Sequence, residues 1–139
     1  MARRWDVDQI PDQSGKTVIV TGANSGIGFG AATVLAAKGA HVIFACRNLD
    51  KANKAVASLR EEVSDANVDV MELNLANLDS VRSFADAFRG RFDSLHLLCN
   101  NAGVMALPKT MTDDGFEMQI GTNHLGHFAL TGLLLDPLL

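Results

Sequence analysis

The segment TGANSGIG at residues 21–28 has a composition that suits a phosphate-binding turn. Its glycines follow the pattern G-x-x-x-G-x-G at Gly22, Gly26 and Gly28. Glycine has no Cβ and reaches unusual dihedral angles, so such a turn lets backbone N–H groups approach a pyrophosphate closely. The spacing differs from the G-x-G-x-x-G fingerprint and leaves Asn24 and Ser25 at the lip of the turn. There they can cap the following helix or contact a ligand.

The residues on both sides of this turn have the character of regular elements. Residues 17–20 are apolar or β-branched, as in a buried parallel strand. Beyond the turn, apolar residues recur at helical spacing at Ile27, Ala31, Val34 and Leu35. A strand that leads through a glycine turn into a helix predicts a nucleotide site. The alternative is a strand-to-helix turn that binds nothing, and the flanking elements disfavour it.

Three further segments have the composition of strands, at residues 41–46, 68–73 and 95–100. Asp69 and Glu72 interrupt the second of these and indicate a strand at a sheet edge. Helix-like patterns separate the strand segments. This alternation predicts an α/β domain with a parallel sheet and right-handed crossovers.

The helices of this domain are expected at three further places. Residues 50–63 carry apolar side chains on one face, which is typical of an amphipathic helix. Asn77 is positioned to cap a helix whose apolar residues fall within 81–88. Thr112 is similarly positioned to cap a last helix from about Asp113 onward.

In a parallel sheet of this kind, ligands bind beyond the carboxyl ends of the strands. The segments that follow the later strands should therefore share one rim with the glycine turn. They are Arg47 and Asn48, Asn74 and Leu75, and Asn101, Ala102 and Gly103. An arginine after the second strand suits the 2′-phosphate of NADP, whereas an acidic residue would suit the 2′-hydroxyl of NAD. The asparagines suit adenine and ribose edges, although a solvated Arg47 and ordinary turn asparagines are the alternatives.

Asn123 lies between Gly121 and Gly126, and all three residues are poor helix formers within an expected helix. We expect a kink there that frees a backbone carbonyl, or a buried Asn123 side chain that faces the ligand. His124 and His127 have no further ligand at a suitable spacing. We therefore predict no metal site and place both histidines at the surface or at an interface.

Composition restricts the classes of function. A chain of 139 residues is at most one domain, which we assign to residues 1–139 with a loose lead-in at 1–15. The net charge of −4 gives no general attraction for nucleic acid. The N-terminus lacks the apolar region of a signal peptide, and no apolar run is long enough for a membrane span. Two cysteines, Cys46 and Cys99, are best explained as buried free thiols in a reducing compartment, which predicts a cytoplasmic protein.

Three motifs in this order resemble the short-chain dehydrogenase/reductase family: TGANSGIG at 21–28, NNAG at 100–103 and NHLG at 123–126. The stretches ACRN (45–48), NNAGVM (100–105) and DGFEMQIGTNHLGHFALT (114–131) are most similar to its branch of retinol dehydrogenases and protochlorophyllide reductases. That branch uses NADP(H). We therefore expect a Rossmann-type parallel sheet of strand order 3-2-1-4 with helices on both faces, as the first part of a doubly wound domain.

The resemblance implies an NADP(H)-dependent oxidoreductase that moves hydride to or from an alcohol, a carbonyl or a double bond. It makes Asn123 the counterpart of a catalytic asparagine. The predicted cofactor residues, from the resemblance and the rim together, are Gly22, Asn24, Ser25, Gly26, Ile27, Gly28, Arg47, Asn48, Asn74, Leu75, Asn101, Ala102 and Gly103. The family usually has Asp-Leu where this sequence has Asn74-Leu75, and we expect the amide to be tolerated.

The family's catalytic serine and its Tyr-x-x-x-Lys pair follow the asparagine helix. This sequence has no tyrosine, and we expect the chain as given to be catalytically incomplete and inactive alone. The expected strand at 95–100 would leave an apolar edge unpaired, so self-association through that edge and the C-terminal helix is a further expectation. The alternative function is a non-catalytic nucleotide-binding or interaction module.

Overall fold

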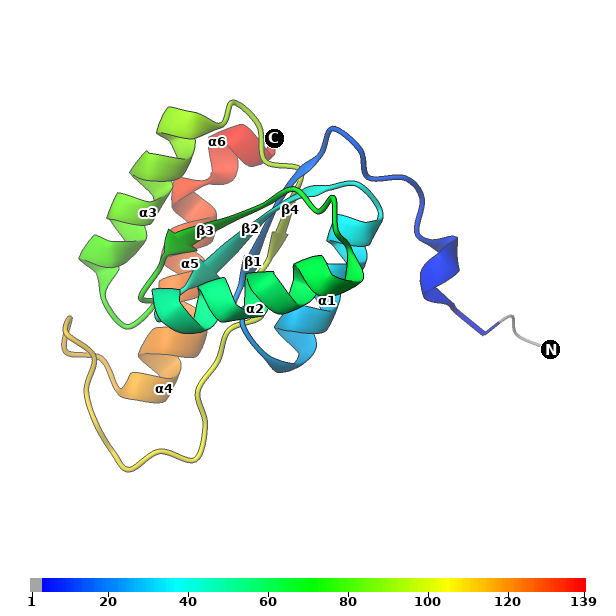
Figure 1. Cartoon of the computed structure of the whole chain (residues 1–139). Coiled ribbons are helices and arrows are strands. Elements are labelled where there is room, and N and C mark those ends of the chain that lie inside the picture. The colour runs from blue at the N-terminus through cyan, green and yellow to red at the C-terminus, as the bar shows by residue number, and fades with distance from the viewer. Residues whose placement is uncertain (1–3) are drawn as a thin grey trace.

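The computed structural model of the chain describes residues 4–139, and its centre is an all-parallel sheet of four strands. The strands are β1 (Thr17–Thr21), β2 (His41–Cys46), β3 (Val68–Glu72) and β4 (Leu97–Cys99). They lie in the order β3-β2-β1-β4, so the predicted α/β architecture and strand order are confirmed (Figure 1). The Cα of Val20 pairs with those of Phe44 and Cys99, so the carboxyl ends of these strands align at one edge.

Helices cover both faces of the sheet (Figure 1). On one face lie α1 (Gly26–Ala37) and α2 (Leu49–Glu62), and on the other lie α3 (Leu78–Arg91), α5 (Gly126–Leu133) and α6 (Leu135–Leu138). Successive side chains of a strand point to opposite faces. Val20 therefore packs in the core under α1 and α2, while Ile19 packs with Phe88 and Leu130 under α3 and α5. Burial on both faces explains why the strands are continuously apolar.

The polar residues of β3 mark a sheet edge, as the sequence predicted. Asp69 accepts a hydrogen bond from His41 Nε2 at 2.9 Å and from Arg91 at 3.0 Å, which ties β2, β3 and α3 together. The predicted cap of α3 is also confirmed, because Asn77 Oδ1 accepts from the backbone N–H of Ser80 at 3.0 Å.

Helix α1 packs against the sheet through small residues, and not through the larger apolar residues that its sequence pattern indicated. Its buried positions are Gly28, Ala32 and Ala36, whereas Ile27 is 86% exposed. Small side chains at four-residue spacing allow the helix axis to come close to the sheet. The glycine turn is therefore held directly against the strand ends.

The prediction that Thr112 caps a helix from Asp113 is wrong. Thr112 N–H donates to the Phe116 carbonyl at 2.7 Å and forms a tight turn, and α4 (Met118–Ile120) begins only after it. Glu117 caps α4 instead, with its carboxylate accepting from two backbone N–H groups. The reason is tertiary: Asp113 accepts from Asn77 Nδ2 at 2.8 Å, which anchors the turn to the start of α3.

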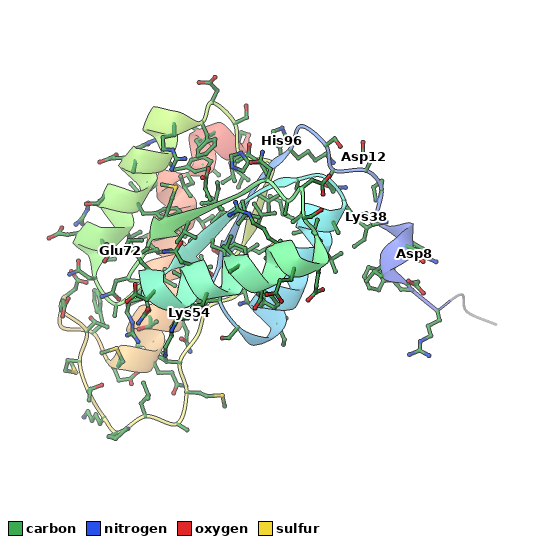
Figure 2. All side chains as sticks on the ribbon, in the orientation of Figure 1. Asp8, Asp12, Lys38, Lys54, Glu72 and His96 are labelled. Atoms are coloured by element: carbon green, nitrogen blue, oxygen red, sulfur yellow. The ribbon has the colours of Figure 1, made fainter. Side chains whose placement is uncertain are left out.

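The predicted lead-in at residues 1–15 is partly ordered, although its first three residues lie outside the described part of the chain. A 3-10 turn at Val7–Gln9 is capped by Asp6 and projects away from the domain (Figure 1). Gln13 N–H then donates to the Lys38 carbonyl at 2.8 Å. Figure 2 shows Asp12 of the lead-in near Lys38. Within residues 4–139, no helix combines the length and the apolar character that a membrane crossing requires.

Candidate functional site

A cavity of about 530 Å³ opens at the carboxyl ends of the strands. It brings together residues from the glycine turn and from the ends of the three other strands. The predicted residues that line it are Gly22, Asn24, Ser25, Arg47, Asn74, Leu75, Asn101, Ala102 and Gly103. Residues far apart in the sequence therefore share one wall, because a parallel sheet places all its strand ends on the same side.

Four predicted residues, Gly26, Ile27, Gly28 and Asn48, lie beside the cavity and do not line it. Asn48 is a helix cap, since its Oδ1 accepts from Lys51 N–H at 2.9 Å at the start of α2. Gly28 is buried, and a Cβ there would lie 2.5 Å from the Gly22 carbonyl oxygen. Gly28 therefore shapes the site by letting two backbone segments approach closely, whereas Asn48 acts as the cap of α2.

The N-terminus of α1 is open toward an anion. Ser25 occupies the N-cap position, but its side chain makes no capping hydrogen bond. The first N–H groups of a helix have no partner within the helix, and together with the helix dipole they attract negative charge. Gly22 has a φ of +65°, and a Cβ there would lie 2.9 Å from Ala102 Cα, so only glycine suits this turn.

Arg47 lines the cavity at the end of β2, and its side chain is exposed. Among the salt bridges of residues 4–139, none involves Arg47. Its guanidinium is therefore available to a ligand, and its planar shape suits bidentate contact with a phosphate.

Cys46 forms part of the cavity wall next to Arg47. Burial raises the pKa of the Cys46 thiol, while backbone N–H groups of Ala23 and Asn24 act in the opposite direction. Burial also raises the pKa of Cys99, which is only half-buried and not buried as predicted. Both thiols are free, and a thiol with a raised pKa is a poor nucleophile.

Thr21 holds the turn that follows β4, a role that sequence reasoning missed. Its Oγ1 accepts from the backbone N–H groups of Asn101 and Ala102, each at 2.9 Å. Asn101 Nδ2 donates in turn to the Thr21 carbonyl at 3.1 Å. The only sequence signal is a hydroxyl residue at the last position of a buried strand, directly before Gly22.

His127 is buried, so the prediction that both histidines lie at the surface or an interface is wrong for this residue. Its Nε2 lies 2.8 Å from Thr21 Oγ1, and its Nδ1 lies 2.9 Å from the Asn123 carbonyl oxygen. Because a carbonyl only accepts, Nδ1 carries the hydrogen, and Nε2 accepts from the Thr21 hydroxyl. His124 is exposed, and residues 4–139 contain no cluster of side chains that could hold a metal ion.

Asn123 lies in a π-helical turn, Gly121–Leu125, which is the kink predicted from its glycine neighbours. Such turns occur often at functional sites. Of the two expected outcomes, the kink is present, and the Asn123 carbonyl there accepts from the His127 side chain. The Asn123 side chain is exposed, not buried, and clamps the backbone of Val104. Asn123 Oδ1 accepts from Val104 N–H at 2.8 Å, and Nδ2 donates to the Val104 carbonyl at 2.7 Å. This clamp fixes the first part of the loop that borders the cavity.

A family sequence model and several known oxidoreductases match most of this chain. The sequence model of a family described as short chain dehydrogenase matches residues 16–139. Human retinol dehydrogenase 13 is 51% identical over 124 residues, which are 89% of this chain and 38% of that protein. Human WW domain-containing oxidoreductase is 52% identical over 127 residues, which are 91% of this chain and 31% of that protein.

One solved structure has a similar fold and a similar sequence. It is described as a putative uncharacterized protein from Mycobacterium paratuberculosis, with 48% identity and a TM-score of 0.86. The similarity covers 96% of this chain and 47% of the solved one. The chain thus spans less than half the length of each of these three relatives.

Proposed function

Because this chain belongs to the short chain dehydrogenase family, whose members are oxidoreductases that use a nicotinamide cofactor, we propose that it binds NADP(H). The whole protein would move hydride between that cofactor and a small alcohol, carbonyl or double-bond substrate. The observation that carries the proposal is the cavity that joins the open N-terminus of α1 to the free guanidinium of Arg47.

The order of the strands suits the order of groups in the cofactor. The pyrophosphate would lie over β1, at the N-terminus of α1, and the adenosine ribose would lie over β2 beside Arg47. At that place a 2′-phosphate gains a charge-assisted contact, whereas a ribose hydroxyl gains much less. Asn101 and Ala102, held by Thr21, would border the cofactor from the end of β4.

The cofactor supplies hydride chemistry, and these residues bind and orient it. Asn123 would support the catalytic centre through its clamp on Val104 and its place in the π-helical turn. A carbonyl reduction also needs a proton donor. With no tyrosine in its sequence, the chain alone should not turn over, and NADPH oxidation by this chain with a carbonyl substrate would contradict that expectation.

Charge reversal at Arg47 tests the cofactor assignment. We expect Arg47→Asp to weaken NADPH binding by about tenfold or more, because a charge-assisted contact is lost and replaced by repulsion. NADH binding should change by less than about threefold, since NADH carries no 2′-phosphate. Titration of nicotinamide fluorescence measures both affinities.

The matched control is Arg4→Asp, which makes the same charge change on the exposed lead-in. It should leave both affinities unchanged. Equal affinity of the unaltered chain for NADH and NADPH would contradict the role of Arg47. An equal loss of affinity for NADH and NADPH in Arg47→Asp would also contradict that role.

A non-catalytic nucleotide-binding or interaction module is the second candidate. The observation that favours it is the outer edge of β4, which pairs with no strand among residues 4–139. Leu97 on this strand is 40% exposed. An unpaired strand edge is a ready template for association with another chain. The free thiols of Cys46 and Cys99 fit a reducing compartment, and we propose a cytoplasmic location for either function.

A further inference from the structure

We propose that the base-binding end of the cavity is set for a hydrogen-bond acceptor, so that the chain accepts a 6-oxopurine dinucleotide as well as the adenine form. Asn74 sets this preference. The inference rests on the proposed NADP(H) binding and adds to it the chemistry by which the base is selected.

The base should lie over β3. Neighbouring strands are about 4.8 Å apart, so β3 lies roughly 10 Å from β1, close to the reach of an adenosine from its phosphate. The residues that line the cavity include the apolar Leu73, Leu75 and Ala76 just after β3. Leu107 from the loop after β4 and Met118 of α4 also line it. An apolar slot of this kind suits a flat ring.

The hydrogen bonds of Asn74 determine which way its amide faces. Its Oδ1 accepts from Ala76 N–H at 3.0 Å. A backbone N–H can bond only to the oxygen of the amide, so the nitrogen must point the other way. The Asn74 carbonyl also accepts, from Asn77 N–H at 3.1 Å. Each oxygen atom of Asn74 thus already accepts one backbone hydrogen bond, whereas its NH₂ group donates none within residues 4–139 and is the group free to face the cavity.

A second donor lies next to the first. Leu75 also lines the cavity, and its backbone N–H makes no hydrogen bond within residues 4–139. The Asn74 Nδ2 group likewise makes none within that part of the chain. The end of β3 thus presents two neighbouring donors to a bound base.

Adenine matches two donors poorly. Its 6-amino group is itself a donor and would face the Asn74 NH₂, leaving only ring nitrogens to accept. A 6-oxopurine such as hypoxanthine has an oxygen at position 6 with two lone pairs, which can accept from both groups when its N1–H, itself a donor, is turned away from them. An aspartate at position 74 would behave differently. One of its oxygens would keep the Ala76 bond, and the other would accept from the 6-amino group of adenine.

The test compares NADPH with reduced nicotinamide hypoxanthine dinucleotide phosphate on this chain. Both ligands carry the same fluorescent nicotinamide and the same 2′-phosphate, so only the base differs. We expect the unaltered chain to bind the two with dissociation constants within about threefold of each other. Asn74→Asp should change the ratio of the two dissociation constants about tenfold in favour of NADPH. This is the size expected when one mismatched hydrogen bond becomes a matched one.

Two other variants make the comparison specific. Asn67→Asp makes the same chemical change just before β3, at the opposite end of the strand, where Asn67 is exposed. It should leave the ratio unchanged. Asn74→Ser keeps an oxygen for Ala76 N–H and removes the NH₂ group, and it should move the ratio toward NADPH by about threefold. Thermal melting of each variant shows that it folds.

The outcomes separate this inference from the proposed function. A preference of the unaltered chain for NADPH above about threefold would overturn the inference and leave NADP(H) binding in place. An unchanged ratio in Asn74→Asp and Asn74→Ser would also overturn it. If the unaltered chain binds neither dinucleotide, the proposed function fails, and the inference fails with it.

Discussion

Single atoms decide how closely the glycine turn approaches the rest of the site. Gly28 shows this directly, because a Cβ there would lie 2.5 Å from the Gly22 carbonyl and would also meet Asn101 Nδ2. Gly30, one half-turn further along α1, has no atom within 4 Å of the same position. Two glycines of one helix therefore have different physical roles.

Substitution of these two glycines by alanine tests that difference. Gly28→Ala should lower the free energy of unfolding by about 2 kcal/mol, because the added methyl group overpacks the turn. Gly30→Ala should raise it by about 0.5 to 1 kcal/mol, since alanine is the better helix former. Urea denaturation followed by circular dichroism measures both. A Gly28→Ala variant as stable as Gly30→Ala would show that the turn relaxes freely.

The short element α4 depends on one side chain. The Glu117 carboxylate accepts from the backbone N–H groups of Ile120 and Gln119, each at 3.0 Å. These bonds, the Ile120 bond first, lower the pKa of Glu117 from its ordinary value. Since the folded pKa lies below the unfolded one, this stabilisation is present above the unfolded pKa and is lost as the pH falls through the folded pKa.

The ionised cap therefore predicts a pH-dependent α4. In acid, the amide protons of Gln119 and Ile120 should lose protection as the Glu117 carboxylate becomes protonated. Glu117→Gln should show reduced protection already at neutral pH and little further change on acidification. Hydrogen exchange followed by NMR measures this. Glu61→Gln, at an exposed position of α2, is the control. In this variant the amide protons of Gln119 and Ile120 should still lose protection on acidification.

At the scale of the whole molecule, both outer strands of the sheet, β3 and β4, have one unpaired edge within residues 4–139, and these edges differ in their side chains. The β3 edge carries Asp69 with its His41 and Arg91 partners, and polar groups of this kind discourage edge pairing. The β4 edge carries the exposed Leu97 and has no strand partner within residues 4–139. Association, if it occurs, should therefore use the β4 edge.

A charge on β4 tests this expectation. We expect the average mass of the unaltered chain to rise with protein concentration and Leu97→Lys to reduce that rise, because an edge lysine opposes strand pairing. Val7→Lys places the same charge on the exposed lead-in and should have no effect. Sedimentation velocity measures the mass. A monomer at all concentrations would remove the support for the interaction module.

Much of the fold was predictable because its determinants are local. The apolar strands, the glycine turn and the Asn77 cap each depend on neighbouring residues, and the structure confirms them. The resemblance to the short-chain dehydrogenases is confirmed by the match over residues 16–139. Thr112 was misassigned because the Asp113 contact with Asn77 joins residues 36 positions apart, which no local pattern shows.

The sequence by itself determined the element order, the rim of the sheet and most of the residues that line the cavity. These follow from local composition and from the rule that parallel strand ends share one side. Only the tertiary structure decided the pairing of Thr21 with His127, the clamp of Asn123 on Val104 and the direction of the Asn74 amide. A hydrogen bond depends on the positions of both partners, and folding alone brings partners such as Thr21 and His127 together.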